Sequence, residues 1–157
     1  MPLRVGDKAP DFTLIDTEKK ERSLKEFSGK KTILVFYPGA FTGVCTKEMC
    51  TFRDAITNFN KLNAQVVGIS VDSPFANKGF ADVNKISYPL LSDYSRDVIK
   101  KYEIVHDGFG GLKGYTAAYR SVFVLDKNGI IKYLWVTQNP GVEPPYDEVT
   151  KAVGSFN

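Results

Sequence analysis

The feature that most constrains this chain is a continuous apolar, partly β-branched run at residues 32–37, Thr-Ile-Leu-Val-Phe-Tyr, which Pro38 and Gly39 end. Such a run is typical of a central strand buried on both faces. Apolar residues spaced three or four apart follow it and predict a helix over residues 42–63. The predicted apolar stripe consists of Cys45, Met49, Phe52, Ile56, Phe59 and Leu62. A buried strand that leads into a long helix indicates an α/β fold.

The rest of the chain continues this alternation of strands and helices. Strands are predicted near residues 12–14, over 65–71 and 88–92, and in a hairpin over 121–125 and 130–136 that turns at Asn128–Gly129. Helical segments are predicted at 23–27, from Ser73–Pro74 onward, at 93–102 and at 146–153. We therefore expect one domain over residues 1–157, with a mixed sheet flanked by helices on both faces. This order is that of the thioredoxin-like fold with additional N-terminal structure.

Composition and charge exclude several classes of function. The formal net charge is +3, and the 21 basic residues are interleaved with 18 acidic ones, so no basic stripe predicts nucleic-acid binding. The longest apolar run is far shorter than the roughly 20 residues of a membrane helix. No charged segment leads into a long apolar stretch near the N-terminus, so we expect no secretory signal and a cytoplasmic location. In that compartment the two cysteines are expected to be catalytic or redox-active rather than structural.

Metal and cofactor binding are not expected. His106 is the only histidine, and two cysteines five residues apart offer no zinc-site spacing. The glycine-rich residues 108–114 do not match a phosphate-binding pattern, because Lys113 stands where glycine is required. We interpret this segment as a flexible loop near the rim of the active site.

The position of Cys45 favours chemistry at its sulfur. It lies in the first turn of the predicted helix, at the carboxyl end of the predicted central strand. Unpaired N–H groups and the helix dipole at that place stabilise an anion, and the thiolate is the reactive form of cysteine. On the apolar stripe, the sulfur is expected at the bottom of a pocket. The alternative from position alone is a small, inert core cysteine.

The segment around this cysteine resembles the active-site signature of the peroxiredoxins, the cysteine-dependent peroxidases. The signature is Pro38-x-x-x-Thr42-x-x-Cys45. Four further features agree, in the family's order and over nearly the whole chain: Gly6-x-x-Ala9-Pro10-x-Phe12, Glu48, residues 89–93 (Pro-Leu-Leu-Ser-Asp) and residues 120–126 (Arg-Ser-Val-Phe-Val-Leu-Asp). The resemblance implies a thioredoxin-like fold and peroxidase activity without a cofactor.

The resemblance also implies roles for individual residues. Cys45 is expected to attack a hydroperoxide and become a sulfenic acid. Thr42 is expected to offer its hydroxyl to the thiolate or to the peroxide, besides beginning the helix. Arg120 is expected to stabilise the thiolate and the breaking O–O bond. Pro38 is expected to shield the thiolate, and Glu48 to orient Arg120 through an ion pair.

Cys50 raises the question of how the sulfenic acid is resolved. Five residues along a helix correspond to about 140° of rotation and 7.5 Å of rise, which predicts that Cys50 faces away on a polar face beside Arg53 and Asp54. In the Q-type subfamily, also called bacterioferritin-comigratory proteins, a cysteine at this spacing is the resolving thiol. That resemblance implies a Cys45–Cys50 disulfide, for which the start of the helix must unwind.

Other interpretations remain open from the sequence. Residues 40–45 and 139–142 also resemble the one-cysteine AhpE-type branch, in which an external thiol resolves the sulfenic acid. A thioredoxin-like disulfide reductase lacks support because there is no C-x-x-C, and a redox-inert binding protein or chaperone would leave the signature unexplained. The family implies a thioredoxin- or glutaredoxin-like reductant as partner, and either a monomer or a homodimer.

Overall fold

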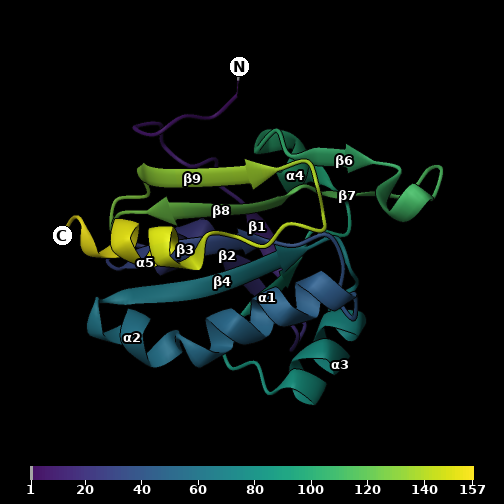
Figure 1. Ribbon diagram of the computed structural model, residues 1–157, viewed down its shortest axis with the longest axis horizontal. Coiled ribbons are helices and arrows are strands. Elements are labelled where there is room, and N and C mark those ends of the chain that lie inside the picture. The colour runs from purple at the N-terminus through teal and green to yellow at the C-terminus, as the bar shows by residue number, and fades with distance from the viewer. Residues whose placement is uncertain (1) are drawn as a thin grey trace.

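A seven-stranded mixed sheet forms the centre of the computed structural model, which describes residues 2–157 (Figure 1). Its strand order is β2-β1-β5-β4-β3-β8-β9. The strands are β1 (Thr13–Ile15), β2 (Glu21–Ser23), β3 (Lys31–Phe36), β4 (Ala64–Ser70), β5 (Leu90–Ser92), β8 (Arg120–Leu125) and β9 (Ile131–Thr137). A separate antiparallel pair consists of β6 (Val105–Asp107) and β7 (Thr116–Ala118).

Five α-helices and two 3-10 turns make up the remaining regular structure of residues 2–157. The helices are α1 (Gly43–Asp54), α2 (Ile56–Lys61), α3 (Pro74–Asn84), α4 (Asp97–Lys101) and α5 (Tyr146–Gly154), and the 3-10 turns are η1 (Leu24–Phe27) and η2 (Phe109–Gly111). In Figure 1, α1 and α2 follow one another along β4, and α5 lies beside β8. Within residues 2–157, no helix is both long enough and apolar enough to cross a bilayer.

The predicted central strand is β3, and all six of its residues are buried. It pairs in parallel with β4 and antiparallel with β8, where Phe36 lies opposite Ser121. The β8 and β9 strands form the predicted hairpin. The sheet is therefore mixed, and the predicted thioredoxin-like architecture is confirmed. One consequence matters for the site: the last residue of β3 and the first residues of β8 lie at the same edge of the sheet.

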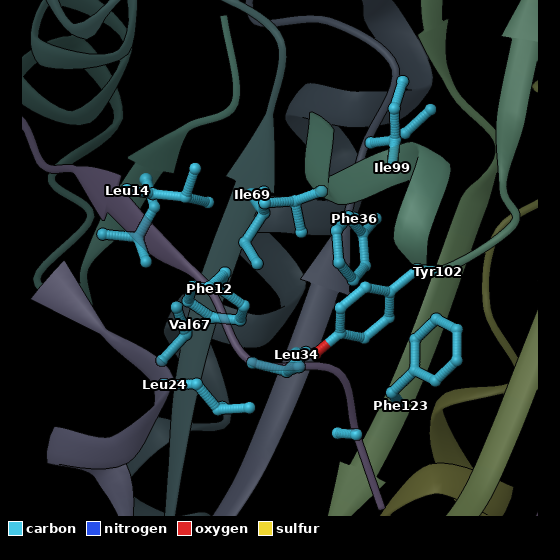
Figure 2. Close-up of a cluster of buried hydrophobic side chains, with 14 of the residues drawn as sticks. Phe12, Leu14, Leu24, Leu34, Phe36, Val67, Ile69, Ile99, Tyr102 and Phe123 are labelled. Atoms are coloured by element: carbon cyan, nitrogen blue, oxygen red, sulfur yellow. The ribbon is translucent and has the colours of Figure 1, made fainter. Parts of the chain in front are cut away.

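Alternate side chains of β3 enter two different cores. Leu34 and Phe36 belong to the core that η1 and α4 cover, and Figure 2 shows Phe36 beside Tyr102 and Phe123. The three ring centroids are 5.1 to 5.7 Å apart. Ile33 and Val35 point to the opposite core, which α1, α2, α3 and α5 cover with Met49, Phe52, Phe59, Phe80 and Val149. Helices on both faces leave residues 33–36 of this strand without solvent contact.

The single helix predicted over residues 42–63 is wrong, because the structure has two helices that meet at Ala55. The Ala55 amide is shared between the carbonyl oxygens of Thr51 and Phe52, at 3.1 and 3.2 Å, and this sharing ends α1. After the bend, Phe59 still stacks on Phe52 at 6.2 Å between centroids. The apolar spacing thus continues through the break, and for that reason the pattern predicted one helix.

The helix predicted over residues 93–102 begins later, at Asp97. The Asp93 carboxylate accepts hydrogen bonds from the amides of Val98 and Ile99 at 3.2 and 2.9 Å. Asp93 therefore satisfies unpaired amides of the first helical turn while lying outside the helix. Arg96 precedes the helix with a φ of 65°, which is not helical. The strands β2, β6 and β7, each three residues long, were not predicted.

Candidate active site

Cys45 occupies the first turn of α1, as predicted. Thr42, the residue before the helix, is extended, and its carbonyl oxygen accepts the hydrogen bond from the Thr46 amide at 2.9 Å. The amides of residues 43–45 precede the helical hydrogen-bond ladder and concentrate partial positive charge there. The Cys45 side chain has no exposed surface, and its thiol is free. The reactive atom therefore lies at a helix terminus that favours an anion, shielded from bulk water.

Arg120 brings a permanent positive charge to this sulfur. It is the first residue of β8 and only 2% exposed. Its Nη1 donates to Cys45 Sγ at 3.2 Å and to Glu48 Oε1 at 2.7 Å, and its Nη2 donates to the Pro140 carbonyl oxygen at 2.7 Å. Burial alone would lower the pKa of Arg120, but the adjoining Glu48 and Cys45 raise it. The guanidinium thus stays charged and is fixed by three different groups.

The sheet register explains why residues 75 positions apart in the sequence meet. Ser121 pairs with Phe36, so Arg120 lies just beyond the end of β3. From that end the chain passes through Pro38 into α1. Because the end of β3, the beginning of β8 and the beginning of α1 lie at one edge of the sheet, Cys45 and Arg120 meet although they belong to segments far apart in the sequence.

Glu48 is the third member of this buried cluster. It lies three residues after Cys45, on the same side of α1, and has no exposed surface. The ion pair expected with Arg120 is present at 2.7 Å. Burial raises the pKa of the Glu48 carboxyl to about 8, although Arg120 acts in the opposite direction. In the described part of the chain, Glu48 Oε2 and Arg120 Nε have no hydrogen-bond partner.

Pro38 and Thr42 lie in the turn that connects β3 to α1. The Thr42 hydroxyl donates to the Gly39 carbonyl oxygen at 2.8 Å. Across residues 2–157 it makes no hydrogen bond to Cys45, nor does it cap α1, so its expected donation to the thiolate is not observed. Its oxygen keeps lone pairs that can accept a hydrogen bond. Pro38 is buried, and Phe41 is held at a φ of 64° with its ring edge-on to Phe80.

Cys50 lies on the polar side of α1 beside Arg53, as predicted, and both side chains contact Asn84, but α3 partly covers this face, which was not predicted. It is half-buried between α1 and α3, and its Sγ donates to Asn84 Oδ1 at 3.6 Å. The prediction considered one helix in isolation and could not include α3, which packs beside it. Both cysteines are free, and α1 is continuous from Gly43 to Asp54. This arrangement keeps the two thiols apart on one intact helix.

Sequence reasoning missed the Pro140 carbonyl, which accepts one arm of the Arg120 guanidinium. A backbone carbonyl carries no side-chain signal, and residues 138–145 show neither helical nor strand periodicity. The predicted loop at residues 108–114 does lie near the site, since a β-carbon at Gly39 would be 3.8 Å from the Phe109 ring.

Taken together, these groups can stabilise negative charge on sulfur and on an oxygen bound to it. A buried guanidinium, a helix terminus and a carboxyl that fixes the guanidinium surround one thiol. Electrostatic stabilisation of this kind is strong because water is excluded. Such a site suits nucleophilic attack on a bond that breaks to give an anionic oxygen.

Comparisons with known proteins agree with this chemistry. Residues 5–134 match the model of the AhpC/TSA family. Peroxiredoxin Q of Sedum lineare is 42% identical over 96% of this chain and 78% of its own length, and that of Arabidopsis thaliana is 44% identical over 85% and 59%.

Solved structures give the same answer for the fold. The crystal structure of peroxidoxin BcpB from Mycobacterium tuberculosis has a TM-score of 0.87 with 29% identity and covers 99% of both chains. AhpC of Enterococcus faecalis has a TM-score of 0.84 with 27% identity, and covers 98% of this chain and 91% of its own. The chain therefore belongs to the AhpC/TSA family and is a thiol-dependent peroxidase of the peroxiredoxin kind.

Proposed function

We propose that the protein reduces hydrogen peroxide and organic hydroperoxides through a sulfenic acid on Cys45, that Cys50 resolves this intermediate, and that a thioredoxin-like dithiol recycles the disulfide. The observation that supports it most is the 3.2 Å hydrogen bond from Arg120 Nη1 to the Cys45 sulfur, inside a buried cluster at a helix terminus. Neither a metal nor an organic cofactor is needed for this chemistry.

In the first step the Cys45 thiolate attacks the terminal oxygen of the peroxide. An S–O bond forms and the O–O bond breaks, so that sulfur is oxidised to a sulfenic acid and the leaving alkoxide or hydroxide takes up a proton to become an alcohol or water. Arg120 stabilises the negative charge on the leaving oxygen, and Glu48 holds the guanidinium in place. The Thr42 oxygen, whose own proton is donated to Gly39, accepts the hydrogen bond from the peroxide O–H.

The approach of the peroxide requires a small local movement, because the Cys45 side chain has no exposed surface. We propose that the turn from Pro38 to Phe41, which leads from β3 into α1, moves to admit the peroxide, because the φ of 64° at Phe41 is a place where backbone strain can be released. Pro38 then limits how much water enters together with the peroxide.

In the second step Cys50 attacks the Cys45 sulfenic acid. The S–S bond forms, the S–O bond breaks, and the hydroxyl leaves as water with the Cys50 proton. The half-buried Cys50 on the same helix supports this assignment over an external thiol, although an external thiol remains the alternative. A dithiol reductant of thioredoxin or glutaredoxin type then reduces the disulfide and takes the oxidised form itself.

We also propose that the protein forms a homodimer and is located in the cytoplasm. A homodimer is supported by the exposed apolar side chain of Phe41 next to the site, which is 58% exposed and available for a second copy. Two cysteines that serve a redox cycle suit a reducing compartment, and the cytoplasm is the one that we propose.

Two variants test the cycle. Reduced protein is mixed with less than one equivalent of hydrogen peroxide, thiols are blocked by alkylation at intervals, and the products are identified by mass spectrometry. Cys45→Ser should lose rapid thiol oxidation altogether. Cys50→Ser should keep one rapid turnover and accumulate a sulfenic acid that a dimedone-type reagent traps. Rapid oxidation that survives in Cys45→Ser would contradict the assignment of the nucleophile.

A further inference from the structure

Formation of the proposed disulfide requires α1 to open between its two cysteines. On an ideal helix, α-carbons five residues apart are separated by about 8 to 9 Å. A disulfide bridges α-carbons roughly 4.4 to 6.8 Å apart. Both cysteines lie within the continuous helix Gly43–Asp54, so at least one peptide between them must leave the helix before the sulfurs can bond.

One side chain holds the backbone of this five-residue stretch from outside. The Tyr88 hydroxyl donates to the Met49 carbonyl oxygen at 2.6 Å. The Met49 peptide lies immediately before Cys50. Tyr88 is 6% exposed and Met49 is fully buried, so the bond is shielded from water. Burial also raises the pKa of Tyr88 well above its ordinary value, so the phenol remains a neutral donor.

A second contact holds α1 just past this stretch. Arg53 Nη1 donates to the Asn84 carbonyl oxygen at 2.5 Å, and Cys50 itself donates to the Asn84 side chain. These contacts come from the end of α3 and fix α1 from Cys50 onward. The Tyr88 bond differs from them because its acceptor is a backbone carbonyl between Cys45 and Cys50. The hydrogen bond from Tyr88 therefore opposes the opening of α1 that formation of the disulfide requires.

From these contacts we infer that Tyr88 is a positioning residue that sets how often α1 opens between Cys45 and Cys50, and thereby divides the Cys45 sulfenic acid between disulfide formation and further oxidation. The inference rests on the proposed resolving role of Cys50. In the closed helix the sulfenic acid stays beside Arg120 and a second hydroperoxide can oxidise it to a sulfinic acid, releasing water or an alcohol. In the open form Cys50 reaches it, and the disulfide forms with loss of water.

The variant Tyr88→Phe removes the hydroxyl and keeps the ring, so it isolates this hydrogen bond. When α1 opens in this variant, the Met49 carbonyl oxygen can accept a hydrogen bond from water. The phenylalanine ring carries no hydrogen-bond donor, so the opening leaves no donor at residue 88 without a partner. Opening should therefore become about 2- to 10-fold more frequent, the range that corresponds to one net hydrogen bond. The first reaction, between Cys45 and peroxide, should keep its rate, because Tyr88 makes no hydrogen bond to Cys45, Glu48 or Arg120 among residues 2–157.

Tyr102→Phe is the matched control. Tyr102 is also a buried tyrosine whose hydroxyl donates to a backbone carbonyl, that of Pro10 at 2.8 Å, but it lies in the core on the other face of the sheet (Figure 2). Its loss should lower overall stability by a comparable amount and leave α1 unaffected. A merely structural effect would appear in both variants.

The experiment follows three quantities in wild type, Tyr88→Phe and Tyr102→Phe: the rate of the first thiol oxidation, the rate of Cys45–Cys50 disulfide formation by rapid quench, and the fraction of Cys45 sulfinic acid at excess hydrogen peroxide. In Tyr88→Phe alone, disulfide formation should rise about 2- to 10-fold and the sulfinic fraction should fall. Amide hydrogen exchange of residues 45–50 in the reduced protein should rise by the same factor, which gives a readout that does not depend on turnover.

Two results would overturn the inference, and they are distinguishable. If wild type forms the Cys45–Cys50 disulfide, and Tyr88→Phe forms it at the same rate and exchanges its amides equally fast, Tyr88 has no positioning role while the proposed cycle stands. If wild type forms no such disulfide after one equivalent of peroxide, the resolving role of Cys50 fails, and the inference fails with it.

Discussion

The sharpest consequence of the site geometry concerns Arg120→Lys, a substitution that keeps the positive charge but changes its shape. Arg120 uses two nitrogens of a planar fork to reach three groups: the Cys45 sulfur, the Glu48 carboxylate and the Pro140 carbonyl. A lysine ammonium is a single point of charge and cannot reproduce this arrangement. Because Glu48 and Cys45 lie 2.7 and 3.2 Å from the same nitrogen, lysine would satisfy the closer carboxylate first.

The magnitude follows from the bond that is lost. A hydrogen bond to a charged group contributes about 1.5 to 3 kcal/mol, and the Cys45 bond is buried, so no solvent screening reduces it. If that bond is absent in the transition state, the rate constant for oxidation of Cys45 falls by about 10- to 150-fold. The fork that fixed the leaving oxygen is lost as well, so we expect the upper part of this range.

Stopped-flow mixing of the reduced variant with hydrogen peroxide, followed by thiol quantification, measures this constant directly. Ultraviolet absorbance, which reports thiolate, and the unfolding midpoint in urea, each compared with wild type, show whether the substitution changes the ionisation of the sulfur or the stability of the fold. A rate within about threefold of wild type, with the thiolate still present, would refute the reasoning, because charge alone would then suffice and the orientation of the fork would be irrelevant.

Two further expectations follow from the structure. Burial raises the pKa of Glu48 from an ordinary value of 4.5 to about 8, so the folded protein holds this proton more tightly than the unfolded chain does, and the free energy of unfolding falls as pH rises from about 4.5 to 8. Glu48→Gln does not titrate, so its free energy of unfolding should increase relative to that of wild type by at most about 1.4 kcal/mol per pH unit in that range. Parallel pH profiles of the two proteins in urea unfolding would contradict this. Gly68→Ala would place a β-carbon 2.6 Å from the Leu90 side chain and 2.8 Å from the Met49 side chain, so the free energy of unfolding should fall by about 1 to 3 kcal/mol. An unchanged midpoint in urea unfolding would show that these side chains move aside freely.

The parts of the fold that the sequence predicted are those in which burial and local pattern coincide. The run at residues 32–37 could be assigned because a strand buried on both faces has no polar positions, and β3 fulfils this. The hairpin of β8 and β9 could be assigned from Asn128–Gly129. The three-residue strands β2, β6 and β7 are too short to show an alternation, and their pairing is set by partners elsewhere in the chain.

The site was predictable where side chains carry the chemistry, and not where the backbone or a neighbouring element does. The resemblance at Cys45 and Arg120 pointed to residues that the structure brings within 3.2 Å. The Pro140 carbonyl gave no signal, and neither did the bond between Tyr88 and the Met49 carbonyl, because any residue type can supply a carbonyl. The surroundings of Cys50 depended on α3, which a single helical wheel cannot include.

The antiparallel pairing of β3 with β8 has a consequence for the protein during its own synthesis. The cysteine leaves the ribosome 75 residues ahead of the arginine that makes it reactive. Until the strand that begins at Arg120 has been made and has inserted beside β3, the Cys45 sulfur lacks the guanidinium that donates a hydrogen bond to it. We therefore expect rapid oxidation of Cys45 by peroxide only after β8 has joined the sheet, and slower oxidation in a chain that has not finished folding.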